Sequence, residues 1–296
     1  MRYLLTSFLL LLFITLYHST AFSSNLKIIA TIKPIHSLVA SVTDGVLKPL
    51  LIAHTTTSIH DHILKPSDVS NLESSDIIFY IDDNLETFVK TFAKNNKKLV
   101  QLSKAVNLLS VRPHLFSKHI IHIQDEKDMY IWLSPENAKH MILFISTTLS
   151  DIDKENSYKY KQNAIKTIKR IEQETEKILK ELNNFKNKKY IVIHDTYQYY
   201  EKYFHLNHPS ALLSIEEDAY IGMKSLMKLR KIIKEEDIKC IFTSLQEDKI
   251  KSKSLPNNAK VIILDPIGLN INPGKDAYLN IINEITQNFK SCFIEP

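Results

Sequence analysis

Three side chains of metal-ligand type lie next to predicted secondary-structure elements in widely separated parts of the chain. His60 lies just ahead of a helix-start signal, because Pro66 is tolerated in a first helical turn but not mid-helix. His194 ends one β-branched run, and Asp265 ends another. In open α/β sheets, ligands bind beyond the carboxyl ends of the strands. The three residues therefore predict one convergent metal site.

The elements that must position these residues alternate between strand and helix patterns. Apolar runs predict strands, which are 26–32, 50–53, 76–81, 99–102, 190–193, 238–243 and 261–264. Between them, capping signals and apolar periodicity predict helices, which are 33–42, 66–72, 85–92, 135–149, 225–235 and 278–289. This alternation predicts an α/β fold with parallel sheets, and the second half repeats the plan of the first.

A long helix is predicted between the two halves, at about 154–185. Its apolar positions recur with a 4-3 spacing, and about 30 residues at 1.5 Å each would span about 45 Å. The alternative is the seam of a coiled-coil dimer. Because an α/β pattern restarts directly after it, we favour a rigid helix that joins two pseudo-symmetric lobes.

The predicted organisation has four parts. They are a signal peptide at 1–23, an N-terminal metal-binding lobe at 24–150, the linking helix at 151–186 and a C-terminal metal-binding lobe at 187–296. Two similar lobes form a cleft, and we expect His60, His194 and Asp265 to meet there.

The first residues have the pattern of a secretory signal. Arg2 precedes a mostly apolar run at 4–16, and small residues follow, so cleavage is expected after Ala21 or Ser23. An uncleaved membrane anchor is the alternative, but the run is short for a bilayer span of about 20 residues. No cysteine lies near the cleavage region, which argues against a lipid anchor. The pattern predicts a soluble periplasmic protein.

The composition excludes several classes of function. Apolar residues make up 44% and charged residues 24% of the chain, as in ordinary globular proteins. The net charge of +5 has no accompanying nucleic-acid motif, so no nucleic-acid partner is expected. Only four glycines are present, and they are too scattered to form a phosphate-binding loop.

The two cysteines, Cys240 and Cys292, both lie in the last quarter of the chain. In an exported protein they predict one disulfide, closing a loop of about 50 residues, to which the chain-entropy model assigns about 4 kcal/mol. Two buried free thiols are the alternative. A thiolate metal site is disfavoured, because two cysteines alone cannot complete it.

Several motifs occur in an order that resembles a known family. The motifs are Thr31-Ile32-Lys33-Pro34, His60-Asp61-x-x-Leu64-x-Pro66-Ser67-Asp68, Trp132-Leu133-Ser134-Pro135, His194-Asp195-x-Tyr197-x-Tyr199 and Leu264-Asp265-Pro266-Ile267-Gly268. Together they resemble the metal-binding periplasmic components of ABC importers (cluster A-I, or cluster 9), specifically the high-affinity zinc-binding branch. The resemblance covers nearly the whole mature chain. It also includes the two cysteines, which match the disulfide of some zinc-binding members.

The resemblance implies a metal held between two lobes by His60, His194 and Asp265. A fourth family ligand, a histidine, is replaced here by Tyr130, and a neutral phenol with a pKa of about 10 is a poor zinc ligand. Either water completes a three-residue site, or the metal preference has moved toward manganese or iron, or a nearby histidine compensates. The auxiliary candidates are His62, His119 and His122, and the last two lie with His114 in a predicted loop at 111–128.

The leading functional hypothesis is a non-catalytic, monomeric carrier that captures Zn²⁺ in the periplasm and delivers it to an ABC permease. Imidazole and carboxylate ligands suit zinc, and binding should weaken as the pH falls through about 6.5, because ligand histidines must lose their protons. A Mn²⁺ or iron carrier is the alternative within the class. A zinc metallohydrolase, with Glu216 or Glu217 near the cleft, and a surface adhesin are the alternatives outside it.

Overall fold

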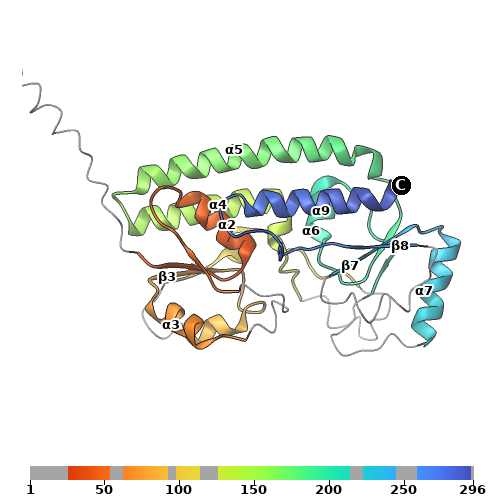
Figure 1. The fold of residues 1–296 in the computed structure, drawn as a ribbon, viewed down its shortest axis with the longest axis horizontal. Coiled ribbons are helices and arrows are strands. Elements are labelled where there is room, and N and C mark those ends of the chain that lie inside the picture. The colour runs from red at the N-terminus through yellow and green to blue at the C-terminus, as the bar shows by residue number, and fades with distance from the viewer. Residues whose placement is uncertain are drawn as a thin grey trace, which may run out of the picture.

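Two parallel sheets form the centres of the two lobes (Figure 1). The computed structural model describes residues 26–53, 63–92, 98–113, 126–213, 223–244 and 259–294. Both sheets have four strands in the same order, with the first strand of the lobe in the second position. The orders are β2-β1-β3-β4 and β6-β5-β7-β8. The predicted α/β fold with two pseudo-symmetric lobes is therefore confirmed.

The strands are short and paired in parallel throughout. In the first lobe they are β1 (Ile28–Ala30), β2 (Leu50–Leu51), β3 (Ile77–Tyr80) and β4 (Lys98–Gln101). In the second lobe they are β5 (Tyr190–Val192), β6 (Ala211–Leu212), β7 (Cys240–Thr243) and β8 (Lys260–Ile263).

The central strands are buried at every position, because both faces of each sheet are covered. In β1, Ile28 and Ala30 enter the main core, whereas Ile29 faces a smaller core on the other side of the sheet. In β5, Tyr190 and Val192 face the main core, and Ile191 faces a third cluster. The main core is continuous across both lobes, so the two sheets share one layer of helices.

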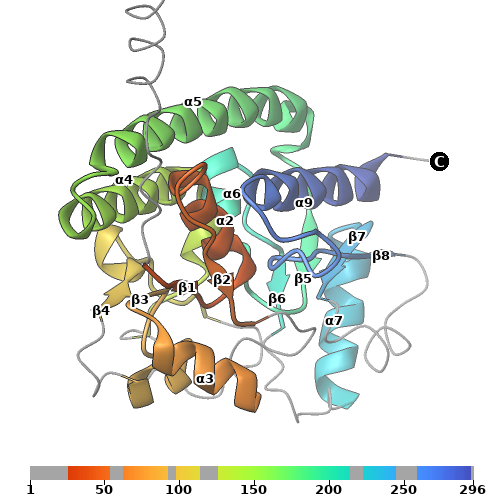
Figure 2. The same cartoon turned by 60° about the vertical axis from the view of Figure 1, so that its left-hand side comes forward.

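The shared layer consists of five helices that together cover one face of both sheets, and Figure 2 shows them from a second direction. They are α2 (Lys33–Val42), α4 (Pro135–Ile152), α5 (Ser157–Leu182), α6 (Gln198–Phe204) and α9 (Ala277–Phe293). The outer faces are covered by α3 (Pro66–Ser74) in the first lobe and α7 (Met223–Glu235) in the second. Short 3-10 turns complete the described elements, and they are η1 (Thr87–Phe92), η2 (Leu102–Ala105), η3 (Ile131–Leu133) and η4 (Asn183–Phe185).

The predicted long helix is α5, which crosses from one lobe to the other above α4 and α9 (Figure 1). Its 26 residues correspond to a length of about 39 Å at 1.5 Å per residue. Ile171, Ile178 and Leu182 of its apolar stripe are buried in the core of the same chain. The apolar stripe of α5 therefore packs against its own chain and is not the seam of a coiled-coil dimer.

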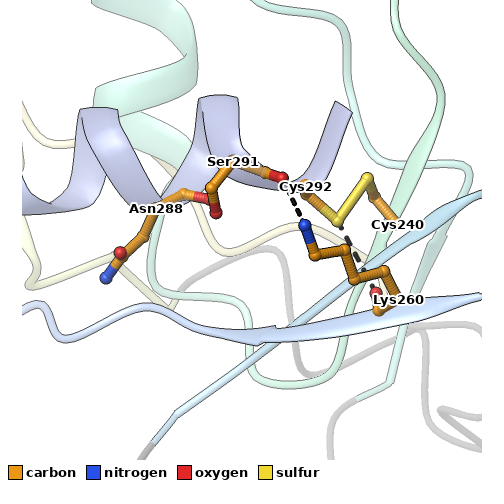
Figure 3. Close-up of a disulfide and its surroundings, with 5 residues drawn as sticks. All are labelled: Cys240, Lys260, Asn288, Ser291 and Cys292. Carbon is orange, nitrogen blue, oxygen red and sulfur yellow. Dashed lines mark hydrogen bonds between the residues drawn. A yellow bond between two sulfur atoms is a disulfide. The ribbon is translucent and has the colours of Figure 1, made fainter. Parts of the chain in front are cut away.

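The disulfide between Cys240 and Cys292 forms as expected, with their Cα atoms 5.8 Å apart. Figure 3 shows that it ties the end of α9 to the start of β7. Beside it, the ammonium group of Lys260 donates a 2.6 Å hydrogen bond to the carbonyl oxygen of Ser291. The last helix is thus fixed to two neighbouring strands of the second sheet.

Among the described residues, no helix has the length and apolar character needed to cross a bilayer. The predicted signal peptide at 1–23 lies outside the described residues.

Candidate metal centre

Asp265 lies two residues beyond the end of β8, in a turn that is built around its carboxylate. The residue is 6% exposed. Its Oδ1 accepts hydrogen bonds from the backbone N–H groups of Ile267 (2.9 Å) and Gly268 (2.8 Å), and its Oδ2 accepts one from Leu269 (2.5 Å). Three backbone donors therefore fix the orientation of this carboxylate at the carboxyl edge of the sheet.

The turn requires glycine at position 268. Gly268 has a φ of +71°, in the left-handed region that side chains disfavour. A Cβ atom there would lie 2.4 Å from Cγ1 of Ile281 on α9, which is far inside contact distance. Only glycine therefore fits at this position, where the turn packs closely against Ile281 of α9.

His194 lies two residues beyond the end of β5, at the same edge of the second sheet as Asp265. The strand β7 separates β5 from β8, so the two strand ends are about 10 Å apart at a spacing of about 4.8 Å per strand. This separation is wide enough to leave room for a ligand between the two side chains.

Tyr130 meets His194 across the site. Its hydroxyl oxygen lies 3.4 Å from Nε2 of His194, and the two rings pack edge to face with centroids 6.2 Å apart. Tyr130 comes from the segment just before η3, and its ring also packs against Trp132, at 5.1 Å between centroids. The sequence position at which the resemblance implies a histidine is therefore beside the second-lobe ligand candidate.

Two buried side chains connect the loops that carry the candidates. The indole N–H of Trp132 donates a 2.8 Å hydrogen bond to the carbonyl oxygen of Pro266, next to Asp265. The hydroxyl of Tyr197 donates a 2.7 Å bond to the carbonyl oxygen of Leu264, on the other side of Asp265. These bonds couple the Asp265 turn to the loops of Tyr130 and His194.

A cavity of about 520 Å³ lies beside this arrangement. Its lining comes from both halves of the chain, namely Asn84, Leu85, Val111, Glu126, Lys127, Asp128, Met129, Tyr130 and Asp195. Two stretches that border the cavity, residues 109–112 and 126–129, are joined by an isolated antiparallel bridge between Ser110 and Lys127. Tyr130 therefore lies at the margin of an open space, and Asp195, the neighbour of His194 in the sequence, lines the same space.

Arg112 connects the stretch 109–112 to the second lobe through two buried carboxylates. Its guanidinium pairs with both oxygens of Asp195, and its Nη1 lies 2.5 Å from Oε2 of Glu201. Burial raises the pKa of Glu201 to about 7, although Arg112 opposes that shift. Burial also raises the pKa of Asp128 to about 7, and this carboxylate accepts a 2.9 Å hydrogen bond from the backbone N–H of Tyr130.

Other residues singled out from the sequence, both ligand candidates and the two glutamates of the metallohydrolase alternative, fall outside the described residues. They are His60 and His62 in the first lobe, His119 and His122 in the predicted loop, and the glutamates Glu216 and Glu217. Within the described ranges, no three histidine, cysteine, aspartate or glutamate side chains gather as a metal site. The structure therefore brings together Tyr130 and His194, and it holds Asp265 at the same edge of the second sheet.

Two charged residues with evident roles were not expected from the sequence. Lys33 is 5% exposed and the side chain of Arg112 is 12% exposed, and both contact the loops that carry the candidate ligands. Lys33 belongs to the Thr31-Ile32-Lys33-Pro34 motif, and a lysine inside an otherwise apolar run was the available signal.

The fold and the site together define a two-lobed α/β binding protein, in which the described candidates Tyr130, His194 and Asp265 lie in segments that follow or precede regular elements. Residues 28–292 match the family described as zinc-uptake complex component A, periplasmic (ZnuA), and the chain belongs to this family.

Known proteins resemble the chain over nearly its full length. The high-affinity zinc uptake system protein ZnuA of Brucella abortus (strain 2308) is 27% identical over an alignment of 305 positions, which covers 90% of this chain and 91% of that protein. A zinc-bound ZnuA deletion mutant has a similar structure, with a TM-score of 0.76 at 19% identity, covering 92% of this chain and 100% of that one. The zinc-bound ZnuA-like domain of Streptococcus pneumoniae AdcA has a TM-score of 0.71 at 19% identity, covering 91% and 99%.

Proposed function

We propose that this protein is the periplasmic carrier of a zinc ABC importer, which captures Zn²⁺ between its lobes and delivers it to a membrane permease. Its membership of the ZnuA family over 28–292 carries the proposal. The relative from Brucella abortus is named as part of a high-affinity zinc uptake system. In this proposal zinc is the cargo, and the chain binds it without transforming it.

The proposed ligands are His60 from the first lobe and His194 and Asp265 from the second. The placement of His194 and Asp265 beyond strand ends at one edge of the second sheet supports this set. Imidazole nitrogen and carboxylate oxygen are both normal zinc ligands, and a site with three protein ligands leaves a fourth position for solvent. We propose the lobes as 24–150 and 187–296, the linking helix as 151–186 and the signal peptide as 1–23.

Tyr130 is the residue most relevant to the choice of metal. A site that lacks one nitrogen ligand is relatively better for harder ions, so a Mn²⁺ or iron carrier is the competing proposal. The zinc-named relatives favour zinc. Competition calorimetry decides between the two, because tight Mn²⁺ binding with feeble Zn²⁺ binding would exclude the zinc assignment.

The ligand set is tested by substitution in each lobe. His60→Ala and His194→Ala should each weaken zinc binding at least tenfold, which corresponds to about 1.4 kcal/mol. Affinity is measured against a chromogenic chelator, using protein purified without an affinity tag. His205→Ala is the matched control, since His205 lies at the end of α6 and was not proposed as a ligand. Wild-type affinity in both lobe variants would overturn the site.

A further inference from the structure

Lys33 is a buried lysine that crosses from the first lobe to the second. It begins α2 and is 5% exposed. Its ammonium group donates hydrogen bonds to the carbonyl oxygens of Gly268 and, at 3.0 Å, Leu269. A lysine is rarely this buried, because removing its charge from water is costly unless partners compensate. Its position therefore needs an explanation beyond surface solubility.

The carbonyl groups that hold Lys33 belong to the turn that holds Asp265. The peptide group between Gly268 and Leu269 bonds both side chains, because its oxygen accepts from Lys33 and its nitrogen donates to Asp265 Oδ2. Hydrogen bonds in such a chain polarise one another. Lys33 thus acts on the carboxylate through one shared peptide group, and from the opposite lobe.

The hydrogen bonds of Asp265 leave one acceptor position open. An ionised carboxylate has about four lone-pair sites. Two N–H groups use Oδ1 and one uses Oδ2, so the remaining site of the described set is on Oδ2. The direction of that lone pair depends on the peptide group to which Lys33 is bonded.

We propose that Lys33 is a positioning residue of the metal site, which holds the Asp265 turn so that Oδ2 faces the cargo ion. The inference rests on the proposed function, in which Asp265 is a ligand. It also gives the first lobe a second contribution to the site, besides His60. Burial lowers the pKa of Lys33, while the nearby carboxylates of Asp265 and Glu284 oppose that shift.

A different lysine supplies a matched control. Lys275 also links the lobes, with its ammonium group 2.8 Å from Oδ2 of Asp44, but its side chain is 46% exposed and its partner follows α2. Lys275→Met therefore removes an interlobe lysine contact without removing a bond to the Asp265 turn.

The test compares Lys33→Met, Lys275→Met and Asp265→Asn with wild-type protein. Zinc affinity is measured by chelator competition, and the d–d absorption spectrum of bound Co²⁺ reports the coordination geometry. Lys33→Met should weaken zinc binding by about 10- to 100-fold and change the Co²⁺ spectrum, whereas Lys275→Met should match wild type in both.

The outcomes separate the inference from the proposed function. If Asp265→Asn binds zinc like wild type, the ligand assignment fails. If Asp265→Asn weakens binding but Lys33→Met keeps wild-type affinity and spectrum, while losing only thermal stability, Lys33 is merely a lobe contact and the inference is overturned.

A measurement on wild-type protein covers the case in which Lys33→Met does not fold. Hydrogen exchange of the amides of Gly268 and Leu269 is followed with and without Zn²⁺. The proposal expects slow exchange already in the zinc-free protein, because the turn is set before the metal arrives. Rapid exchange that becomes slow only when zinc is added would overturn it.

Discussion

The hydroxyl oxygen of Tyr130 lies 3.4 Å from Nε2 of His194, so the residue at the position where the resemblance implies a histidine directly faces a proposed zinc ligand. A zinc ion bound to this nitrogen must displace the hydroxyl contact. Because a neutral phenol is a weak zinc donor, Tyr130 offers little in exchange. This relationship makes Tyr130 the most informative residue for the number of ligands.

If the site consists of three protein ligands and solvent, Tyr130→His should tighten zinc binding by restoring a nitrogen donor. Tyr130→Phe should change little, since it removes only a weak contact. Both affinities are measured by chelator competition at one pH. A histidine variant that binds zinc no better than wild type would count against the open-site interpretation.

Two other results would point to different ligands. Marked loss of binding in Tyr130→Phe, with a preference for Fe³⁺, would identify a phenolate ligand. If neither Tyr130 variant changes the zinc affinity, but His119→Ala or His122→Ala lowers it, a loop histidine is the additional ligand.

Gly268 offers a second prediction, because its conformation and its surroundings both exclude a side chain. Gly268→Ala should destabilise the protein by about 3 kcal/mol or more, the sum of a left-handed backbone and a clash with Ile281. It should also weaken zinc binding, since the N–H of Gly268 holds Asp265.

The control is Gly45→Ala, which has a similar φ of +75° but only an ordinary 3.6 Å contact with Lys159. Gly45→Ala should lower the free energy of unfolding by about 1 to 2 kcal/mol, because only the left-handed backbone conformation is strained. Urea unfolding measures both variants. If both variants lose the same free energy of unfolding, the turn accommodates a Cβ atom at position 268 and the contact with Ile281 adds no cost.

The sequence could predict most of the fold for a simple physical reason. Strands such as β1 and β5 are buried on both faces, so they appear as continuous apolar runs. The strand β6 has only two residues, Ala211–Leu212, and is too short to give a pattern. The helix α6 was also missed, because its seven residues, Gln198–Phe204, are rich in aromatic side chains that favour strands.

The site was less predictable, because its geometry depends on contacts between distant segments. His194 and Asp265 were recognisable as polar residues that follow apolar runs. The role of Lys33 depends on a partner 235 residues away, and that of Arg112 on partners 83 and 89 residues away. No local pattern reports such pairings.

Arg112 gives a third prediction, about stability. Its two carboxylate partners are nearly inaccessible to water, with side chains of Asp195 and Glu201 at 5% and 3% exposure. Arg112→Met would leave both buried without their cation, so it should cost about 3 to 5 kcal/mol in urea unfolding.

Arg170→Met is the comparison for this effect. Arg170 pairs with Asp276 at 2.6 Å, but the side chains are 40% and 54% exposed, so its loss should cost less than about 1 kcal/mol. If the two arginine variants lose the same stability, the buried cluster contributes no more than a surface pair.

The last prediction concerns Glu86, a fully buried carboxylate in the first lobe. Its Oε2 accepts hydrogen bonds from the backbone N–H groups of Ile81 (2.7 Å) and Asp82 (3.1 Å), and its Oε1 pairs with the hydroxyl of Thr31. Burial nevertheless dominates and raises the pKa of Glu86 to about 7. In the unfolded chain a glutamate has a pKa of about 4.3.

The folded state therefore binds this proton more tightly than the unfolded state does. The resulting stabilisation is fully present below pH 4 or so and is lost as the pH rises through about 7.

Glu86→Gln imitates the protonated form at every pH. Its amide oxygen can accept the two backbone bonds, and its NH₂ group can donate to Thr31. Between pH 5 and pH 8 the variant should gain on the order of 1 to 3 kcal/mol relative to wild type. Urea unfolding at the two pH values measures this difference, and Glu176→Gln, at an exposed position on α5, should show no comparable gain. If the difference in free energy of unfolding between Glu86→Gln and wild type is the same at pH 5 and pH 8, Glu86 is ionised in the folded protein at both pH values.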